Sequence, residues 1–201
     1  DMNDDFGEPD HVNFAAKAYF LLYDTDIDFM FLAGGSKTPR YGFDFSRNIG
    51  TNFEVHGEFA FIRNFRKPLV DADGNTTSIT YDAVNYVLGT RYLSTLNTTF
   101  ILEYYSQGTG YSSEEISDLL TFIDKGYNAF LSNGNSQALA KARSVAQQGG
   151  YGRFTPQEHY LYFRVSQPEP FDILYFTPSV TWIYNLSDRS FTITPELLYT
   201  P

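Results

Sequence analysis

The chain has 201 residues, of which 42% are hydrophobic and 18% aromatic, with a formal net charge of −10 and a pI near 4.6. This acidic balance argues against nucleic-acid binding, because a phosphate backbone requires a basic surface. The absence of cysteine excludes disulfides, thiolate metal sites and cysteine nucleophiles. The sequence has no continuous apolar run of about 20 residues and therefore does not predict a helical membrane protein.

Large apolar and polar side chains alternate in successive segments along the chain. In 52–66, Phe53 and Phe59 fall at odd positions, whereas Glu54 and Glu58 fall at even ones. Because a strand has a period of two, one face would be apolar and the other charged. The pattern predicts nine strands, at 13–23, 27–35, 41–48, 52–66, 79–94, 98–107, 159–167, 171–185 and 190–200.

The connections between these strands alternate between tight turns and generally longer loops. The tight turns are 24–26, 49–51, 95–97 and 168–170, and the longer connections are 36–40, 67–78, 108–158 and 186–189. Outer-membrane barrels have short periplasmic turns and longer extracellular loops. We therefore predict an antiparallel up-and-down transmembrane β-barrel that occupies 1–201 as one domain or a partial barrel. Because nine is odd and bacterial barrels normally have an even strand number, we expect either a fragment of a larger barrel or a strand count that is off by one.

The segment 108–158 interrupts the strand pattern with helical spacing. Ser112 and Glu115 form a capping box, which predicts a helix start. A second helix is expected over 136–148, before Gly149. The predicted apolar stripe of the first helix would pack against the inner wall or rim of the barrel and act as a gate; it consists of Ile116, Leu119, Leu120, Ile123 and Tyr127. A docking site for a protein partner is the alternative role of this insertion.

The chain resembles bacterial outer-membrane β-barrels of the porin-like, export-channel type. The residues that carry the resemblance are the strand segments 52–66, 81–92, 99–105 and 171–199. The resemblance implies a Gram-negative outer membrane and transport. One departure is the end at Thr200 and Pro201 in place of a terminal aromatic residue, which again favours a truncated barrel.

The polar positions of the predicted strands are expected to line the lumen, because a Lys or Arg facing lipid costs about 2–4 kcal/mol near the midplane. They are Lys17, Asp28, Asp44, Glu54, His56, Glu58, Arg91, Glu103, Arg164 and Glu196. The aromatic positions would face lipid. The predicted function is a channel or transport barrel that passes small solutes or ions. The alternatives are a soluble ligand-binding β protein and a structural or partner-docking barrel.

Catalysis and cofactor binding are not expected. Glu54, His56 and Glu58 share a predicted strand face, but one histidine with two carboxylates is a thin basis for a metal or acid–base site. The segment 71–75 has a glycine too early for an EF-hand and lacks its closing glutamate, so it predicts an exposed turn. We therefore predict a non-enzyme with no metal.

Overall fold

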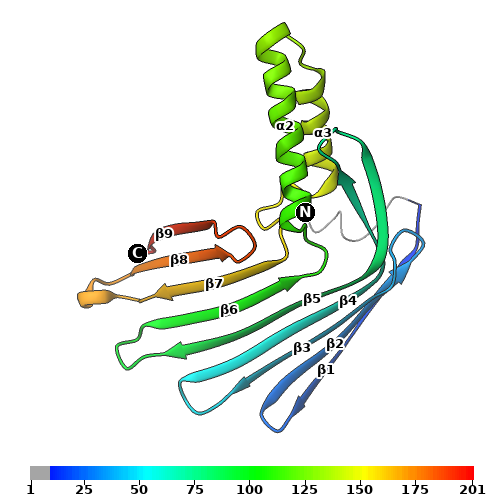
Figure 1. Ribbon diagram of the computed structural model, residues 1–201. Coiled ribbons are helices and arrows are strands. Elements are labelled where there is room, and N and C mark those ends of the chain that lie inside the picture. Colours follow the sequence, from blue (N-terminus) through cyan, green and yellow to red (C-terminus); the bar gives the residue numbers. More distant parts are fainter. Residues whose placement is uncertain (1–9) are drawn as a thin grey trace.

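The computed structural model describes residues 10–201 and contains one antiparallel sheet of nine strands that follow each other in chain order (Figure 1). The nine predicted strands are confirmed, with ends shifted by a few residues. The predicted alternation of tight turns and longer connections is wrong, because 71–75 and 186–190 are as short as 94–98, whereas 167–175 is longer. The strands are β1 (Asn13–Leu22), β2 (Thr25–Gly34), β3 (Arg40–Asn48), β4 (Phe53–Val70), β5 (Thr76–Leu93), β6 (Thr99–Gln107), β7 (His159–Ser166), β8 (Phe176–Asn185) and β9 (Phe191–Tyr199). A short 3₁₀ helix, η1 (Pro170–Asp172), lies between β7 and β8.

Two strand prolines occupy positions that tolerate a missing N–H. Pro178 lies just beyond the last paired residue of β7, where its carbonyl accepts a hydrogen bond from the Gln167 amide. Pro195 belongs to β9, an edge strand. Ser190 and Thr200 form backbone hydrogen bonds on the side of the chain that faces β8, so the even-numbered residues of β9 face β8. The odd-numbered residues, Pro195 among them, turn their backbone nitrogen to the free edge.

The sheet is open in the part of the chain from residue 10 onward. β1 and β9 are its two edges, and they do not pair with each other. The antiparallel up-and-down fold with a helical insertion is thus confirmed, but the closure of a barrel is not seen. Both edges carry backbone groups without ladder partners.

The β4–β5 hairpin extends well beyond the neighbouring strands. A bulge at Arg63 and Asn64 shifts the register after Ile62, and the Asn64 amide donates to the Asp82 carboxylate to hold it. Beyond the bulge the hairpin runs to Val70 and Thr76 and contacts both helices of the insertion. These helices, α2 (Ser113–Asn133) and α3 (Gln137–Gly149), rise from the end of the sheet (Figure 1).

We call the two helices and the extended hairpin the helical cap. The predicted capping box is present, since Ser112 Oγ accepts from the Glu115 amide and Glu115 accepts from the Ser112 amide. The cap has a small core of its own, formed by Val70, Tyr111, Leu119, Phe122, Ala142 and Tyr151. Gly126 permits the close approach of the helices, because a Cβ there would lie 3.0 Å from Cβ of Ala138.

The predicted apolar stripe of α2 is wrong in part. Leu119 is buried and Ile116 and Ile123 pack against the core, but Leu120 is 54% exposed and Tyr127 is 52% exposed. The buried face is turned toward Phe122 and Gly126, because α3 and the hairpin tip approach the helix from that side. A gating role for the five residues stays a prediction.

Candidate functional site

The ten side chains predicted to line a lumen all lie on one face of the sheet, which we call the polar face. Direct cross-strand partners share a face, and the register links Asp28 to Asp44 and Asp44 to Glu58. It also links Glu54 to Arg91 and both His56 and Glu103 to Gly89. Ion pairs join the remaining members, Lys17 to Asp28 and Arg164 to Glu196. The structure therefore brings all ten together on this face, and whether the face lines a lumen stays a prediction.

Carboxylates outnumber basic groups among these ten residues. Asp28, Asp44 and Glu58 occupy adjacent positions on three neighbouring strands. One cation meets this row directly, since Nζ of Lys17 lies 2.9 Å from Oδ2 of Asp28. Glu58 is exposed and forms no ion pair within residues 10–201. The polar face therefore carries an excess of acidic groups over β2–β4.

His56 connects two carboxylates across the sheet. Its Nε2 lies 3.2 Å from Oε1 of Glu103, although β5 separates their strands. Gly89 leaves this path open, because a Cβ at that position would clash with the imidazole of His56. On the other side, Nδ1 lies 3.5 Å from Oε1 of Glu54, which is an ion-pair distance without hydrogen-bond geometry. Within the described residues, no group of histidine and carboxylate side chains is arranged to hold a metal ion.

The opposite face, which we call the apolar face, is aromatic and aliphatic along all nine strands. Phe29, Phe43 and Phe59 follow each other across adjacent strands, and the first two rings are 5.3 Å apart. Within residues 10–201, no second layer covers this face over the sheet (Figure 1). Phe14 is 63% exposed and Leu197 is 74% exposed. An apolar surface of this extent is unusual for a protein in water and indicates an apolar environment or partner.

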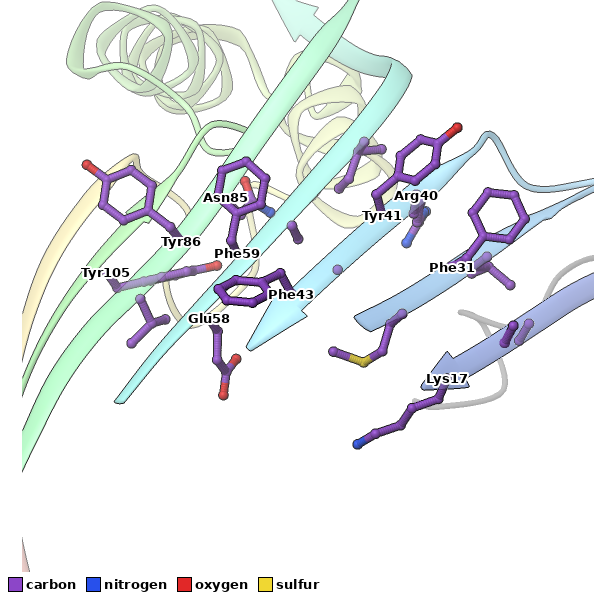
Figure 2. Close-up of a pocket in the computed structure, with 18 residues that line it drawn as sticks. Lys17, Phe31, Arg40, Tyr41, Phe43, Glu58, Phe59, Asn85, Tyr86 and Tyr105 are labelled. Carbon is purple, nitrogen blue, oxygen red and sulfur yellow. The ribbon is translucent and has the colours of Figure 1, made fainter. Parts of the chain in front are cut away.

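A hollow of about 720 Å³ lies over β1–β5. Most of its lining side chains belong to the polar face, so that face is concave there. Small residues create the space, because Ala15, Gly42 and Ala60 lie where neighbouring rows carry charged side chains. Figure 2 shows Lys17 and Glu58 extending to the opposite side of the sheet from Tyr41 and Tyr86.

Three residues with structural importance were not identified from the sequence. Lys67 is 6% exposed and donates to Glu115 at 2.8 Å and to the Gly110 carbonyl at 3.1 Å, at the base of the cap. Gly89 has no side chain to signal its role. Arg40 begins β3 and lines the hollow. β4 carries several other charged residues, including Arg66 directly before Lys67, so the sequence does not single out Lys67. The roles of the other two residues depend on register.

Comparisons with known proteins give no match: no family model fits the sequence, and neither a curated relative nor a solved structure is found to be similar. The porin-like resemblance is thus without independent support. Among the helices of the described residues, none is both long enough and apolar enough to cross a membrane.

Proposed function

We propose that this chain forms part of the wall of an outer-membrane β-barrel that passes small solutes or ions. The observation that carries the proposal is the uncovered apolar face of a single-layer sheet. A soluble β protein covers such a face with a second sheet or a helix. A membrane barrel leaves it in contact with lipid, with polar residues alternating on the inner side.

The charge distribution supports this orientation. If the polar face contacted hydrocarbon, the charged groups of Lys17, Arg91 and Arg164 would each carry a midplane cost of about 2–4 kcal/mol. Turned toward water, the same groups reach carboxylates on neighbouring strands, as Arg164 reaches Glu196 at 3.1 Å. The polar face therefore borders the aqueous passage in our proposal.

The excess of carboxylates sets the expected selectivity. Asp28, Asp44 and Glu58 form a row with one paired lysine, and Glu54 and Glu103 flank a single histidine. Rings of acidic side chains attract cations and repel anions. We infer that the passage favours cations.

Two adjacent residues on opposite faces test the proposal. Phe59→Arg places a charge on the apolar face and should impair insertion into lipid vesicles, at a cost of about 2–4 kcal/mol. Glu58→Gln removes an exposed carboxylate from the polar face and should leave insertion intact while lowering the cation-to-anion permeability ratio. The measurements are folded yield in vesicles and reversal potential across a planar bilayer.

The control is Phe59→Leu, which keeps the apolar face intact and should insert as the unchanged chain does. Normal insertion of Phe59→Arg would show that the apolar face does not contact lipid. Failure of Glu58→Gln to fold, together with normal folding of Phe59→Arg, would mean that the two faces are reversed.

A further inference from the structure

Arg40 is a cation without an ion-pair partner among residues 10–201. Its Nε is buried and has no hydrogen-bond partner. None of the ion pairs within residues 10–201 includes its guanidinium. A partly buried guanidinium usually pairs with a carboxylate or a phosphate, because its planar fork of donors matches those anions. The missing anion is therefore one that this part of the chain does not supply.

The surroundings of Arg40 are apolar. Its direct cross-strand partners on the polar face are Leu32 on β2 and Ile62 on β4. Both belong to the hollow of about 720 Å³, along with Met30 and Ala15. A region of hydrocarbon side chains beside one unpaired cation differs from the charged rows elsewhere on this face.

The other charged groups of the hollow do not neutralise Arg40. Glu58 is four residues from Ile62 along β4, which corresponds to about 14 Å at 3.4 Å per residue. Neither Arg40 nor Glu58 takes part in any ion pair within residues 10–201. Lys17, the remaining charged residue of the hollow, is itself a cation and is paired with Asp28 at 2.9 Å.

We propose that the hollow binds an anionic amphiphile, in which a carboxylate pairs with Arg40 and an aliphatic body lies over Ala15, Met30, Leu32 and Ile62. The apolar lining accepts the body, and the guanidinium selects the anion by a charge-assisted pair of hydrogen bonds. This site goes beyond the proposed passage of solutes, since it requires only the concave surface of β1–β4.

A photoreactive decanoate and the corresponding photoreactive decanol test the site, with the whole chain in lipid nanodiscs. The carboxylate should label Met30, Leu32 or Ile62 saturably, and unlabelled decanoate should compete. Arg40→Gln should weaken the carboxylate about tenfold to a hundredfold and leave the alcohol nearly unchanged, as expected for loss of a charged hydrogen bond. Ala15→Leu, on the edge strand β1, should weaken both probes because it fills the hollow.

Arg164→Gln is the matched control, since Arg164 lies on the same face but is paired with Glu196. It should bind both probes as the unchanged chain does. Equal carboxylate affinity in Arg40→Gln, or labelling of Phe29 and Phe59 on the apolar face alone, would overturn the site. Conductance is measured on the same variants. A chain that conducts without binding contradicts this inference alone, and one that binds without conducting contradicts the channel alone.

Discussion

Gly89 controls whether side chains on β4 and β6 can meet. His56 and Glu103 both lie opposite this residue, on its two neighbouring strands. Their contact at 3.2 Å passes over the glycine, and an added Cβ would clash with the imidazole and lie 2.8 Å from Cγ of Glu103. The absence of one methyl group therefore permits a polar link across three strands.

Gly89→Ala should lower the free energy of unfolding by about 1–3 kcal/mol, the usual range for overpacking. In a His56→Ala background the same substitution should cost much less, because the clashing ring is gone. Denaturant unfolding of the four chains of this double-mutant cycle measures the difference. Gly42→Ala, whose Cβ would meet the flexible Met30 side chain at 3.2 Å, is the control and should be insensitive to His56→Ala. Equal costs of Gly89→Ala in both backgrounds would show that the His56 side chain does not occupy the space above Gly89.

The residues of the polar face were predictable from sequence, but their contacts were not. Alternation along β4 suffices to place Glu54, His56 and Glu58 on one face. That His56 reaches Glu103, or that Arg40 lacks a partner within residues 10–201, depends on how neighbouring strands are aligned. Period-two patterning contains no information on that alignment beyond the choice of face.

The helical cap shows the corresponding limit for an element. Its first helix could be predicted from the capping box and apolar spacing, and its start at Ser113 was found to the residue. The buried face of this helix could not be predicted, because Gly126 allows close packing against α3 but is not hydrophobic. Leu120 and Tyr127 were predicted to belong to the packed apolar stripe, yet α3 and the hairpin leave that side of the helix uncovered.

The cap should loosen at alkaline pH. Burial raises the pKa of Tyr111 above its ordinary value, and burial likewise raises the pKa of Tyr151. Above about pH 10 the unfolded chain therefore binds fewer protons at these two tyrosines than the folded chain does. Their contribution to the free energy of unfolding is constant below that pH and falls as the pH rises toward the folded-state pKa. The helical signal in circular dichroism, which arises chiefly from α2 and α3, should decrease together with tyrosine ionisation in this range.

The double variant Tyr111→Phe, Tyr151→Phe identifies the groups responsible. It loses the hydrogen bonds to the Pro68 carbonyl and the Val70 amide, so the cap is weaker at neutral pH, but its alkaline decrease should become shallower. Tyr127→Phe, at a half-exposed tyrosine of α2, should leave the alkaline decrease unchanged. An unaltered pH dependence in the double variant would assign the loosening to other groups.

At the scale of the whole molecule, strand direction constrains how the sheet closes. β1 and β9 run in the same direction, because each of the nine strands is antiparallel to the next. Direct pairing of β1 with β9 would therefore be parallel. An antiparallel ring built on this sheet needs an odd number of further strands between β9 and β1, from whichever chain they come.

The same alternation divides the connections between two ends of the sheet, which gives a prediction for membrane orientation. The turns after β4 and β8 lie at the cap end, whereas those after β3 and β5 lie at the other.

The chain has no cysteine, so single cysteines can be introduced without background. Asp73→Cys and Asp188→Cys should react with a membrane-impermeant thiol reagent on intact cells, and Thr51→Cys and Thr95→Cys should react only after the outer membrane is opened, because the longest connection of the sheet, which contains α2 and α3, is expected on the outer side. Labelling of opened cells and of unfolded protein controls for reactivity at each position. Reaction of all four positions on intact cells would contradict a spanning sheet, and reaction of Thr51→Cys and Thr95→Cys alone would place the cap in the periplasm.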